Sequence, residues 1–290
     1  MSAPLLFHPT PDAVYGFPHA RLVARVDSLY QRIEVWDTHQ LGRLFTLDGR
    51  PMTSTGDEFI YHECMVHPQA LAHPSPRSAL VLGGGDGGAA RQLLAHPGIE
   101  RIVVAELDAE VVRLTREHLP DVHGGAFDDP RVELVIGDAA HYVAAAAPAQ
   151  FDLVVFDLTP PDSPAAGLYT PAFYARLKRT MRAPAALSLH LGSPYFHARR
   201  IAGLLDDLRG AFGVVRTMQT FVPLYGSLWM MACASDTLDP ASLAADTLVE
   251  RLVARRIGPL KHYDPAMHAG LFSASRSVRD KLSQFLKPSS

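Results

Sequence analysis

Apolar and polar residues alternate in short runs over the first part of the chain. The runs are rich in β-branched and aromatic side chains, and the Asp48-Gly49 pair between two of them is a strong signal for a tight turn. The expected strands are residues 21–26, 31–36, 43–47 and 51–55. Because these runs are too closely spaced to leave room for crossover helices, the pattern predicts a small antiparallel β domain over residues 1–55.

The pattern changes at Gly56, where apolar residues begin to recur at roughly helical spacing. Asp57 and Glu58 favour a helix start there, because acidic side chains are stabilising near a helix N-terminus. Beyond Pro76, apolar runs of strand length alternate with helical patterns. Residues 56–290 are therefore expected to form a second, larger α/β domain.

The alternation after Pro76 predicts a mostly parallel sheet. The expected strands are residues 79–82, 102–105, 132–136, 153–156, 187–191, 214–221 and 228–234. The expected helices are a segment that ends at Leu94 and residues 109–118, 139–147, 171–181 and 196–212, with a polar loop over 121–130. The link over residues 223–227 is too short for a crossover helix, so the last two strands should pair antiparallel. Such a sheet is the class I methyltransferase-like form of the doubly wound, Rossmann-like α/β fold.

A cluster of glycines follows the first expected strand of this sheet. Gly83, Gly85 and Gly88 fit the GxGxxG pattern, in which missing side chains let the backbone approach a nucleotide closely. The next strand ends at Glu106, where a carboxylate would accept hydrogen bonds from ribose hydroxyls. A strand, a glycine turn, a helix and a following acid together predict a nucleoside site rather than a purely structural turn.

Asp86 is the unusual member of this turn. A phosphate-binding turn presents backbone N–H groups to an anion, and a carboxylate inside it would repel a pyrophosphate. The turn therefore favours a nucleoside without phosphates that carries a positive charge. A sulfonium nucleoside of the S-adenosylmethionine type meets both conditions, whereas NAD does not.

Acidic residues recur at the carboxyl ends of the expected strands. Asp86, Glu106, Asp138 and Asp157 each lie at or just beyond such an end, and this edge of an open α/β sheet is where ligands bind. The alternative for each of them is that the acid merely caps the following helix. Four acids along one edge favour a pocket for cationic ligands, such as a sulfonium together with a protonated amine.

The overall composition excludes several other classes of protein. The net charge is -3 without long runs of one sign, which argues against nucleic acid as a partner. Cys64 and Cys233 have no metal-ligand spacing and are expected to be buried thiols in a reducing compartment. The N-terminus lacks the features of a signal peptide, and no apolar run has the length of a membrane span. We expect a cytoplasmic protein that does not bind a membrane.

Several stretches of the chain resemble one enzyme family. They read SLYQRIEVW, LFTLDGRPM, GDEFIYHE, VLGGGDGG, VAELD, VIGDAA, FDLVVFD, LYTPAFY, VPLYGSLWMMACAS and HYDPAMHAGLF. From about Ser28 to Phe272 the chain resembles the spermidine synthases, that is, the polyamine aminopropyltransferases. The resemblance implies that the small N-terminal β domain mediates formation of a homodimer or homotetramer.

The same resemblance implies a chemical reaction. An amine acceptor, putrescine or a related di- or polyamine, attacks the methylene carbon next to the sulfonium of decarboxylated S-adenosylmethionine, and methylthioadenosine leaves. The sulfonium is already a good leaving group, so no metal and no cofactor beyond this co-substrate are expected. The enzyme supplies positioning and removes a proton. The catalytic base that the resemblance implies is Asp157.

The resemblance also assigns residues to two halves of the site. The donor half, which holds the methylthioadenosine part, comprises Gln31, Gly83, Gly85, Asp86, Glu106, Asp138, Ala139 and Pro164. The polyamine half comprises Tyr61, His62, Asp86, Asp157, His190 and Tyr225. Glu106 is expected on the ribose hydroxyls, Asp138 on the adenine amino group and Asp86 on the ammonium of the transferred group. Ordinary core packing is the alternative for Tyr61 and Tyr225, and a histidine satisfied by its neighbours is the alternative for His62.

The chain departs from the family in the loop from Asp157 to Pro164. The family's loop usually reads D-[ST]-[ST]-D-P-x-G-P, whereas this chain reads DLTPPDSP. Pro160 occupies the position of the second acid, and Asp162 is the candidate substitute. Where many members have glutamine after the next strand, this chain has His190, whose near-neutral pKa makes it a second candidate for proton removal. These changes predict an acceptor other than putrescine, or weak binding of putrescine.

Two other functions stay open from the sequence. One is an S-adenosylmethionine-dependent methyltransferase on the same fold, which Asp86 disfavours because its expected partner is an ammonium made accessible by decarboxylation. The other is a non-catalytic polyamine- or nucleoside-binding paralogue in which Pro160 marks lost activity. Retention of Asp157 beside all the expected donor residues disfavours this second alternative.

Overall fold

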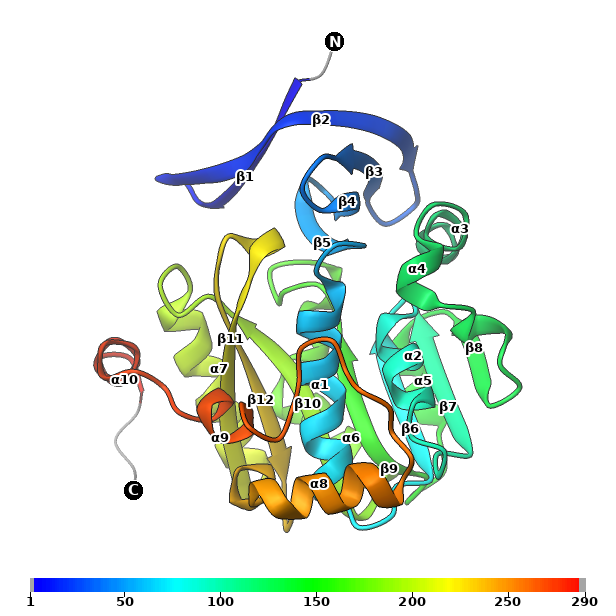
Figure 1. The fold of residues 1–290 in the computed structure, drawn as a ribbon, viewed down its shortest axis with the longest axis vertical. Helices are drawn as coiled ribbons and strands as arrows, with labels where there is room; N and C mark the ends of the chain where they lie inside the picture. Colours follow the sequence, from blue (N-terminus) through cyan, green and yellow to red (C-terminus); the bar gives the residue numbers. More distant parts are fainter. Residues whose placement is uncertain (1–2, 287–290) are drawn as a thin grey trace.

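The computed structural model describes residues 3–286 of the 290-residue chain, and its first element is a small antiparallel sheet (Figure 1). Its strands, in spatial order, are β1 (Ala3–Thr10), β2 (Ala13–Asp27), β3 (Arg32–Thr38), β4 (Gly42–Leu47) and β5 (Arg50–Ser54). The helix α1 (Glu58–Ala72) follows and enters the larger part of the molecule. We propose to divide the chain here, into an N-terminal β domain over residues 1–55 and a larger α/β domain over 56–290.

A second sheet of seven strands forms the centre of the larger part. Its spatial order is β11-β12-β10-β9-β6-β7-β8. The strands are β6 (Ser78–Gly83), β7 (Arg101–Glu106), β8 (Val132–Ile136), β9 (Phe151–Asp157), β10 (Met181–Gly192), β11 (Val214–Val222) and β12 (Ser227–Ser235). Neighbours pair parallel except for β12, which is antiparallel to both β10 and β11. The expected closing hairpin and the class I methyltransferase-like, doubly wound fold are thus confirmed.

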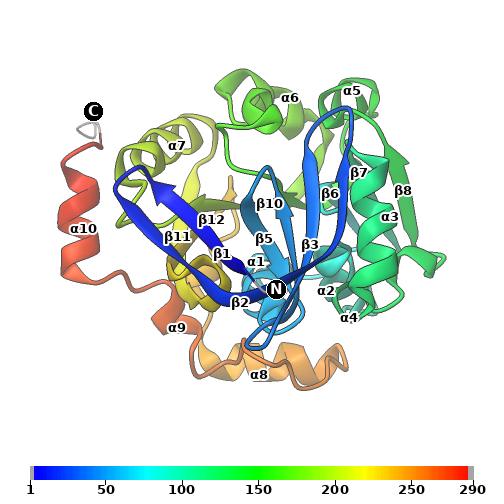
Figure 2. The same ribbon diagram turned by 90° about the horizontal axis from the view of Figure 1, so that it is seen from above.

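Helices cover both faces of this sheet (Figure 2). One face carries α1, α2 (Gly88–Leu94) and α8 (Ala245–Ala254), and the other carries α5 (Ala139–Ala145), α6 (Pro171–Thr180) and α7 (Ala198–Ala211). Successive side chains of a strand point to opposite faces, so Leu80 and Leu82 pack under α6 while Ala79 and Val81 pack under α1. Burial on both faces explains why these strands read as continuous apolar runs.

The small sheet is held on the larger part by two apolar contacts. Ile33 and Val35 pack against α3 (Ala109–His118), while Leu5 and Phe7 pack with the end of β11. The hairpin of β1 and β2 therefore crosses over β11 and β12, as the view from above shows (Figure 2). Space is left between the two sheets at the carboxyl ends of the parallel strands, and the site described below lies there.

Three parts of the chain differ from the sequence expectation. The hairpin of β1 and the first half of β2 was not expected, because Pro9, Gly16 and Pro18 interrupt its alternation. Proline is tolerated in β1 because that strand lies at the edge of its sheet. The loop expected over residues 121–130 is wrong in part, since it contains α4 (Pro120–His123) and a short 3₁₀ turn, Ala126–Asp128. After β12 the chain also forms α8, α9 (His268–Leu271) and α10 (Arg276–Ser283), for which no elements were predicted.

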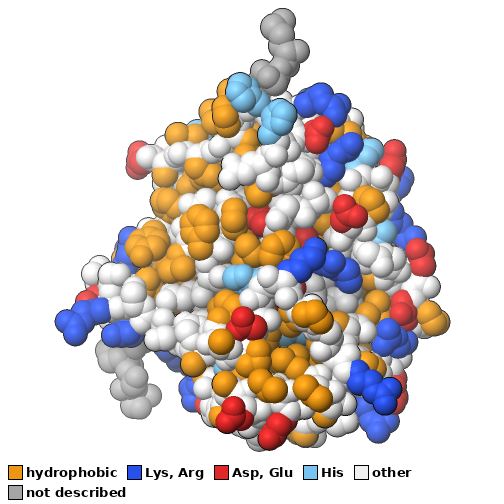
Figure 3. Space-filling view, in the orientation of Figure 1, with side chains coloured by type: hydrophobic (Ala, Val, Ile, Leu, Met, Phe, Trp, Pro, Cys, Tyr) orange, Lys and Arg blue, Asp and Glu red, His pale blue; other side chains and the backbone are white. Residues whose placement is uncertain are grey.

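Side chains of both charges mix on the surface (Figure 3), and the two cysteines are buried as expected. On the face in Figure 3, basic side chains are interspersed with acidic and hydrophobic ones rather than gathered into one basic tract. Cys64 and Cys233 are both buried free thiols. Within residues 3–286, no helix is both long enough and apolar enough to cross a bilayer.

Candidate active site

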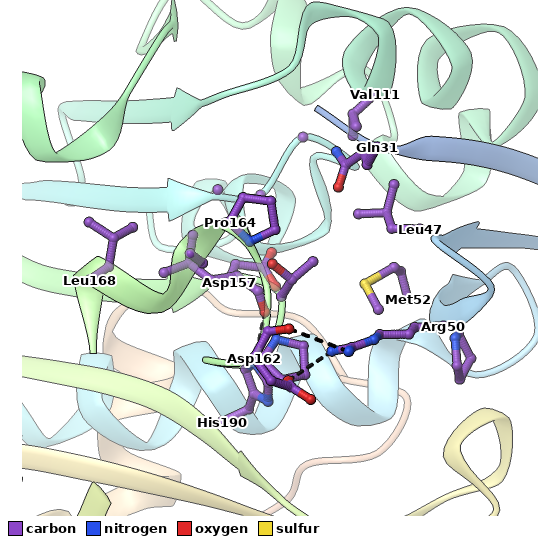
Figure 4. Close-up of a pocket in the computed structure, with 18 of the residues that line it drawn as sticks. Gln31, Leu47, Arg50, Met52, Val111, Asp157, Asp162, Pro164, Leu168 and His190 are labelled. Atoms are coloured by element: carbon purple, nitrogen blue, oxygen red, sulfur yellow. Dashed lines mark hydrogen bonds and ion pairs between the residues drawn. The ribbon is translucent and has the colours of Figure 1, made fainter. Parts of the chain in front are cut away.

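A cavity of about 550 Å³ lies between the two sheets, where β6, β7 and β9 end. In open α/β sheets this edge is where ligands bind. The cavity wall contains every residue that the sequence predicted for the site: Gln31, Tyr61, His62, Gly83, Gly85, Asp86, Glu106, Asp138, Ala139, Asp157, Pro164, His190 and Tyr225. Figure 4 shows part of this wall, with Gln31 and Leu47 on one side and Asp157, Asp162 and His190 on the other.

The glycine turn makes room for other side chains of the site. Gly83 has a φ of +75°, and a Cβ there would lie 2.3 Å from the Asp157 carbonyl oxygen. A Cβ on Gly85 would lie 2.9 Å from the Glu106 carboxylate, and one on Gly88 would lie 2.2 Å from the His62 ring. Since atoms cannot approach so closely, each of the three glycines is required by the packing of this turn.

Glu106 lies directly beneath the turn at the end of β7. Its carboxylate accepts hydrogen bonds from the backbone N–H of Gly85 (3.1 Å) and of Asp108 (2.9 Å). Burial nevertheless raises the pKa of Glu106 to about 7. The site thus holds a carboxyl group that is near its midpoint of titration at neutral pH. Hydroxyl donors would favour its ionised form.

Gln31 reaches the cavity from the loop between β2 and β3. Its side-chain Nε2 donates to Asp108 Oδ2 (3.3 Å), and the hydroxyl of Ser28 donates to the same oxygen (2.6 Å). The other oxygen of Asp108 caps α3 by accepting from the backbone N–H of Glu110. Asp108, which was not predicted as a site residue, therefore positions Gln31 against the larger part of the molecule.

Asp138, Ala139 and Pro164 lie at element starts along the cavity edge. Asp138 caps α5, because its Oδ1 accepts from the backbone N–H of Ala140 at 2.7 Å. The capping alternative is therefore true of Asp138, but the residue also lines the cavity. Ala139 is buried in the first turn of α5, and Pro164 begins the 3₁₀ turn Pro164–Leu168 behind Ser163.

His62 lies among three carboxylates. Its Nδ1 is 2.8 Å from Glu58 Oε2, while its Nε2 is 3.5 Å from Asp86 Oδ2 and 3.7 Å from Asp157 Oδ2. Glu58 in turn accepts from Arg91 on α2 at 2.5 Å. Both ring nitrogens of His62 thus have partners within the protein, as expected for a histidine that is satisfied by its neighbours. Two of those partners, Asp86 and Asp157, are themselves residues of the predicted site.

The charges of this cluster shift one another's pKa values. Burial alone would lower the pKa of His62, but the surrounding carboxylates raise it well above its usual value. The imidazolium in turn lowers the pKa of Asp86 in spite of its burial. The pKa of Asp157 is raised by burial, and the neighbouring negative charge of Asp86 adds to this effect although His62 opposes it. Asp157 is consequently the stronger proton acceptor of the two aspartates.

The same three residues, His62, Asp86 and Asp157, lie close enough to share a metal ion, with one potential ligand atom of each within 4.8 Å of the others. The chemistry of the set fits a metal poorly. Both ring nitrogens of His62 face carboxylates, so the ring is a doubly protonated cation, whereas a metal-ligating histidine needs a free nitrogen lone pair. The cluster instead presents two carboxylates around one fixed positive charge.

Aromatic rings form the wall beyond Asp157. Tyr61 and Tyr225 meet edge to face with centroids 6.3 Å apart, and Trp229 lies 4.3 Å from Tyr225. Tyr225 is anchored through its hydroxyl, which donates to the Met52 carbonyl at 2.8 Å. The two tyrosines therefore line the cavity as well as packing in the core. His190 stacks on the indole of Trp229 at 5.9 Å with an interplanar angle of 12°.

The surroundings of His190 make it a weaker base than a second proton acceptor would need to be. Its Nε2 is 2.7 Å from the Leu158 carbonyl oxygen, so this nitrogen carries the hydrogen and donates it. Burial and the neighbouring Arg200 guanidinium lower the pKa of His190 to about 4. A group with so low a pKa is a poor base at neutral pH. Its Nδ1 is a buried acceptor without a partner among residues 3–286.

Asp162, the candidate substitute for the missing second acid, already has two cationic partners. Arg50 Nη1 donates to its Oδ1 at 2.8 Å, and Arg200 Nη1 lies 3.6 Å from the same oxygen. Figure 4 shows Arg50 reaching across from the small sheet to Asp162. These guanidinium groups lower the pKa of Asp162 against the effect of its burial. Asp162 lines the cavity, but as part of an ion-pair network rather than as a free carboxylate.

Several residues of the cavity wall were not predicted from the sequence. Arg50, Arg200 and Trp229 line it, as do Phe7 and Tyr15 of the unpredicted hairpin. Only Arg200 could have been predicted from its position in the sequence. It lies in the first turn of the helix that follows β10, and thus at the ligand-binding edge of the sheet. The hairpin residues had no such signal, because their approach depends on the packing of the two sheets.

Comparisons with known proteins agree with this geometry. Residues 58–242 match the spermine/spermidine synthase domain. The chain is 45% identical to a polyamine aminopropyltransferase of Nitrosomonas europaea over 95% of this chain and 84% of the relative, and 37% identical to one of Hyperthermus butylicus over 91% and 87%. Its fold is similar to the crystal structure of spermidine synthase from Thermotoga maritima, with a TM-score of 0.88 and 28% identity over 97% of this chain and 94% of that one. A second crystal structure, of spermidine synthase in complex with the transition-state analogue AdoDATO, gives a TM-score of 0.87 and 29% identity over 94% and 92%.

Proposed function

Because this chain belongs to the spermine/spermidine synthase family of aminopropyltransferases, we propose that its donor is decarboxylated S-adenosylmethionine and that its acceptor is a primary amine. The aminopropyl group passes to the amine, and methylthioadenosine is released. Putrescine and related di- or polyamines are the acceptor class to which the family resemblance points. The changes at Pro160 and His190 make putrescine a poor member of that class for this enzyme.

The position of Asp86 is the observation that carries this proposal. Its carboxylate lies in the glycine turn at the cavity wall, 3.5 Å from His62 Nε2, with Glu106 and Asp157 on the same wall. A phosphate group would be repelled there, whereas the ammonium of an aminopropyl chain would be attracted. A donor with a sulfonium at its centre and an ammonium at its end therefore fits this charge pattern.

The reaction proceeds by direct displacement. The lone pair of the acceptor nitrogen attacks the methylene carbon beside the sulfonium, and the carbon–sulfur bond breaks with its electron pair going to sulfur. The sulfur becomes a neutral thioether, and the nitrogen must give up a proton. We assign that proton to Asp157, whose Oδ2 is buried without a hydrogen-bond partner among residues 3–286. The raised pKa of this carboxyl supports the assignment, since it makes the group a better base near neutral pH.

Five residues of the donor half recognise the rest of the donor. Glu106 accepts from the ribose hydroxyls, Asp138 meets the adenine amino group beside Ala139 and Pro164, and Gln31 contacts the methylthioadenosine part from the small sheet. In support, all of these residues line one cavity, and Gln31 and Asp138 are each fixed by a hydrogen bond of 3.3 Å and 2.7 Å respectively.

Incubation of the protein with decarboxylated S-adenosylmethionine and a panel of mono-, di- and polyamines tests the proposal. Mass spectrometry should find methylthioadenosine and an aminopropylated amine in equal amounts. S-adenosylhomocysteine formed from S-adenosylmethionine would instead identify a methyltransferase, and the absence of any product would point to a binding protein. Asp86→Asn adds a sharper control, because it should weaken binding of the decarboxylated donor more than that of methylthioadenosine, which lacks the ammonium.

The N-terminal β domain further supports assembly into a homodimer or homotetramer. It exposes several large apolar side chains: Leu6, Val14 and Leu22 in the hairpin of β1 and β2, and Leu29 and Tyr30 in the loop before β3. Association of two such surfaces would cover these side chains. Sedimentation equilibrium of the full chain measures the oligomeric state directly.

A cytoplasmic location agrees with the two buried free thiols.

A further inference from the structure

Two largely buried carboxylates, those of Asp86 and Asp157, lie close together in the cavity wall. One oxygen of each lies within 4.8 Å of the other and of a ring nitrogen of His62. Carboxylates so close together and so little hydrated cannot both stay ionised without a cation beside them. That cation is the His62 ring, whose Nε2 is 3.5 Å from Asp86 and 3.7 Å from Asp157. The direction of this one N–H bond therefore governs the charge of both aspartates.

Glu58 binds the other ring nitrogen of His62. It is the first residue of α1, is only 4% exposed and lies outside the cavity wall. Its Oε2 accepts a hydrogen bond from His62 Nδ1 at 2.8 Å, and its Oε1 accepts one from Arg91 Nη2 at 2.5 Å. The guanidinium balances the charge of Glu58, so Glu58 acts on the aspartates mainly through the ring that it holds.

The remaining contacts of the ring do not bind a ring nitrogen in this way. Gly88 packs flat against the ring, and Tyr61 meets it edge to face with centroids 5.2 Å apart. The backbone N–H of Gly88 donates to Asp86 Oδ1 at 2.9 Å, so Asp86 Oδ2 is the oxygen that faces the ring. These contacts restrict the plane of the ring, whereas the hydrogen bond to Glu58 specifies which nitrogen points at the aspartates.

The other titratable groups near the ring and the two aspartates add no positive charge. They are Asp57, Tyr61, Glu106, Tyr169 and Tyr225. Burial raises the pKa of each of the three tyrosines well above its usual value, so their hydroxyls are neutral at physiological pH. Both aspartates consequently depend on His62.

We propose that Glu58 is a positioning residue for the transfer reaction, because it directs the Nε2–H of His62 toward Asp86 and Asp157. The inference rests on the proposed function. With the ring so held, Asp86 stays ionised for the ammonium of the donor, and Asp157 stays ionised for the proton of the acceptor nitrogen. Without Glu58 the ring turns away and the two aspartates share a proton. Asp157 takes that proton, since the pKa of its carboxyl is raised while that of Asp86 is lowered, and the base is lost at neutral pH.

Two variants of Glu58 in the full-length enzyme test the proposal. Their kcat is compared with that of the wild type at the same pH, with decarboxylated S-adenosylmethionine and saturating putrescine (1,4-diaminobutane). Glu58→Leu offers nothing to Nδ1 and should lower kcat about 30-fold at pH 7 but only about 3-fold at pH 9, where Asp157 loses the shared proton. Glu58→Gln should stay within about 3-fold of the wild type at both pH values, because either orientation of its amide can pair with Nδ1. An equal loss at both pH values in Glu58→Leu, or no rescue by glutamine, would overturn the inference.

Glu63→Gln is the matched control. Glu63 is a buried acid of the same helix, but it accepts from the backbone N–H groups of residues 261–263 instead of from His62. The variant should lower the melting temperature while its ratio of kcat at pH 7 to kcat at pH 9 stays that of the wild type. A changed ratio would assign the pH effect to loosening of α1 and would overturn the inference.

NMR of protein with ¹⁵N-labelled histidine tests the position of the ring without turnover. The ring signals of His62, assigned by their loss in His62→Gln, should shift in Glu58→Leu and much less in Glu58→Gln. Unshifted signals in Glu58→Leu would overturn the inference. If no amine released methylthioadenosine, the proposed function would fail, whereas these spectra would still decide whether Glu58 positions the ring.

Discussion

The donor end and the acceptor end of the cavity are built in different ways. Most of the donor end comes from the carboxyl ends of the neighbouring strands β6, β7 and β8, through the glycine turn, Glu106 and Asp138. The acceptor end is assembled from Arg50 in the small sheet, Asp162 in a loop and Arg200 on α7. Arg50 and Asp162 are 112 positions apart in the chain, yet they form a direct ion pair.

The fold itself therefore determines the donor end, whereas a few individual side chains determine the charges of the acceptor end. A Cβ on Gly83, Gly85 or Gly88 would collide with Asp157, Glu106 or His62 respectively, so the donor end is tied to the packing of the sheet. The charges at the acceptor end lie on partly exposed side chains that no strand pairing requires; the Asp162 side chain is 58% exposed. Acceptor choice can therefore change without disturbing the donor site, and the following variants test that separation.

The largest expected effect comes from the residue between the two ends. Asp157→Asn should reduce kcat by about 1,000-fold, because positioned acid–base groups contribute 10²–10⁴-fold. The amide keeps the shape of the carboxyl group, so methylthioadenosine affinity should stay within about threefold. Steady-state kinetics and isothermal calorimetry measure the two quantities, and turnover close to that of the wild type would remove Asp157 from the role of base.

The next effect concerns the donor end. Glu106→Gln should weaken methylthioadenosine binding about 30-fold at pH 8, because a charged acceptor of two hydroxyl donors is lost. In the wild type, Glu106 has a pKa raised to about 7, so below that pH it is protonated and must release a proton when the ribose binds. Affinity should accordingly rise about 10-fold from pH 6 to pH 8.

The variant provides the control for that pH dependence. Glutamine does not titrate, so calorimetry on Glu106→Gln should give an affinity that is flat over the same range. An equally steep dependence in the variant would assign the titration to another group, such as His62 or Asp157.

A smaller effect is expected at the acceptor end. Pro160→Asp places a carboxylate where the family's second acid stands, and Pro160→Ala removes the proline ring without adding charge. The aspartate variant should use 1,4-diaminobutane with a kcat/KM about 5-fold above that of the alanine variant, since one partly solvated charge pair contributes about 1 kcal/mol. Equal values for the two variants would show that the charge at this position does not govern acceptor choice.

The smallest effect distinguishes two roles of Asp138. Asp138→Ala removes the cap of α5 and should lower the free energy of unfolding by about 1 kcal/mol. Asp138→Ser keeps a capping oxygen and should stay within about 0.5 kcal/mol of the wild type. Both should raise the KM for the donor by the same factor if Asp138 contacts the adenine. If the KM rose only in the less stable alanine variant, Asp138 would act only as the cap of α5.

Much of the fold was accessible from the sequence because the relevant signals are local. The apolar run of β8 and the helical pattern of α3 match the predicted ranges 132–136 and 109–118. The hairpin of β1 and β2 was not accessible, because its alternation is interrupted by proline and glycine and its strands are stabilised by packing on β11. The C-terminal segment was missed for a related reason, since Glu63 binds the backbone N–H groups of residues 261–263 from almost 200 positions away.

The sequence by itself determined the strand–turn–helix framework, the glycine turn and the row of strand-end acids. Covalent geometry and side-chain periodicity specify these features within a few residues. Only the tertiary structure decided the charges that the site presents. Glu106 titrates near neutrality, His62 becomes a fixed cation and Asp162 is neutralised by Arg50 and Arg200, because each state depends on burial and on distances between remote segments. The glycine turn predicted a site for a cationic nucleoside. The packing of the two sheets determined which charges lie at the acceptor end of the cavity.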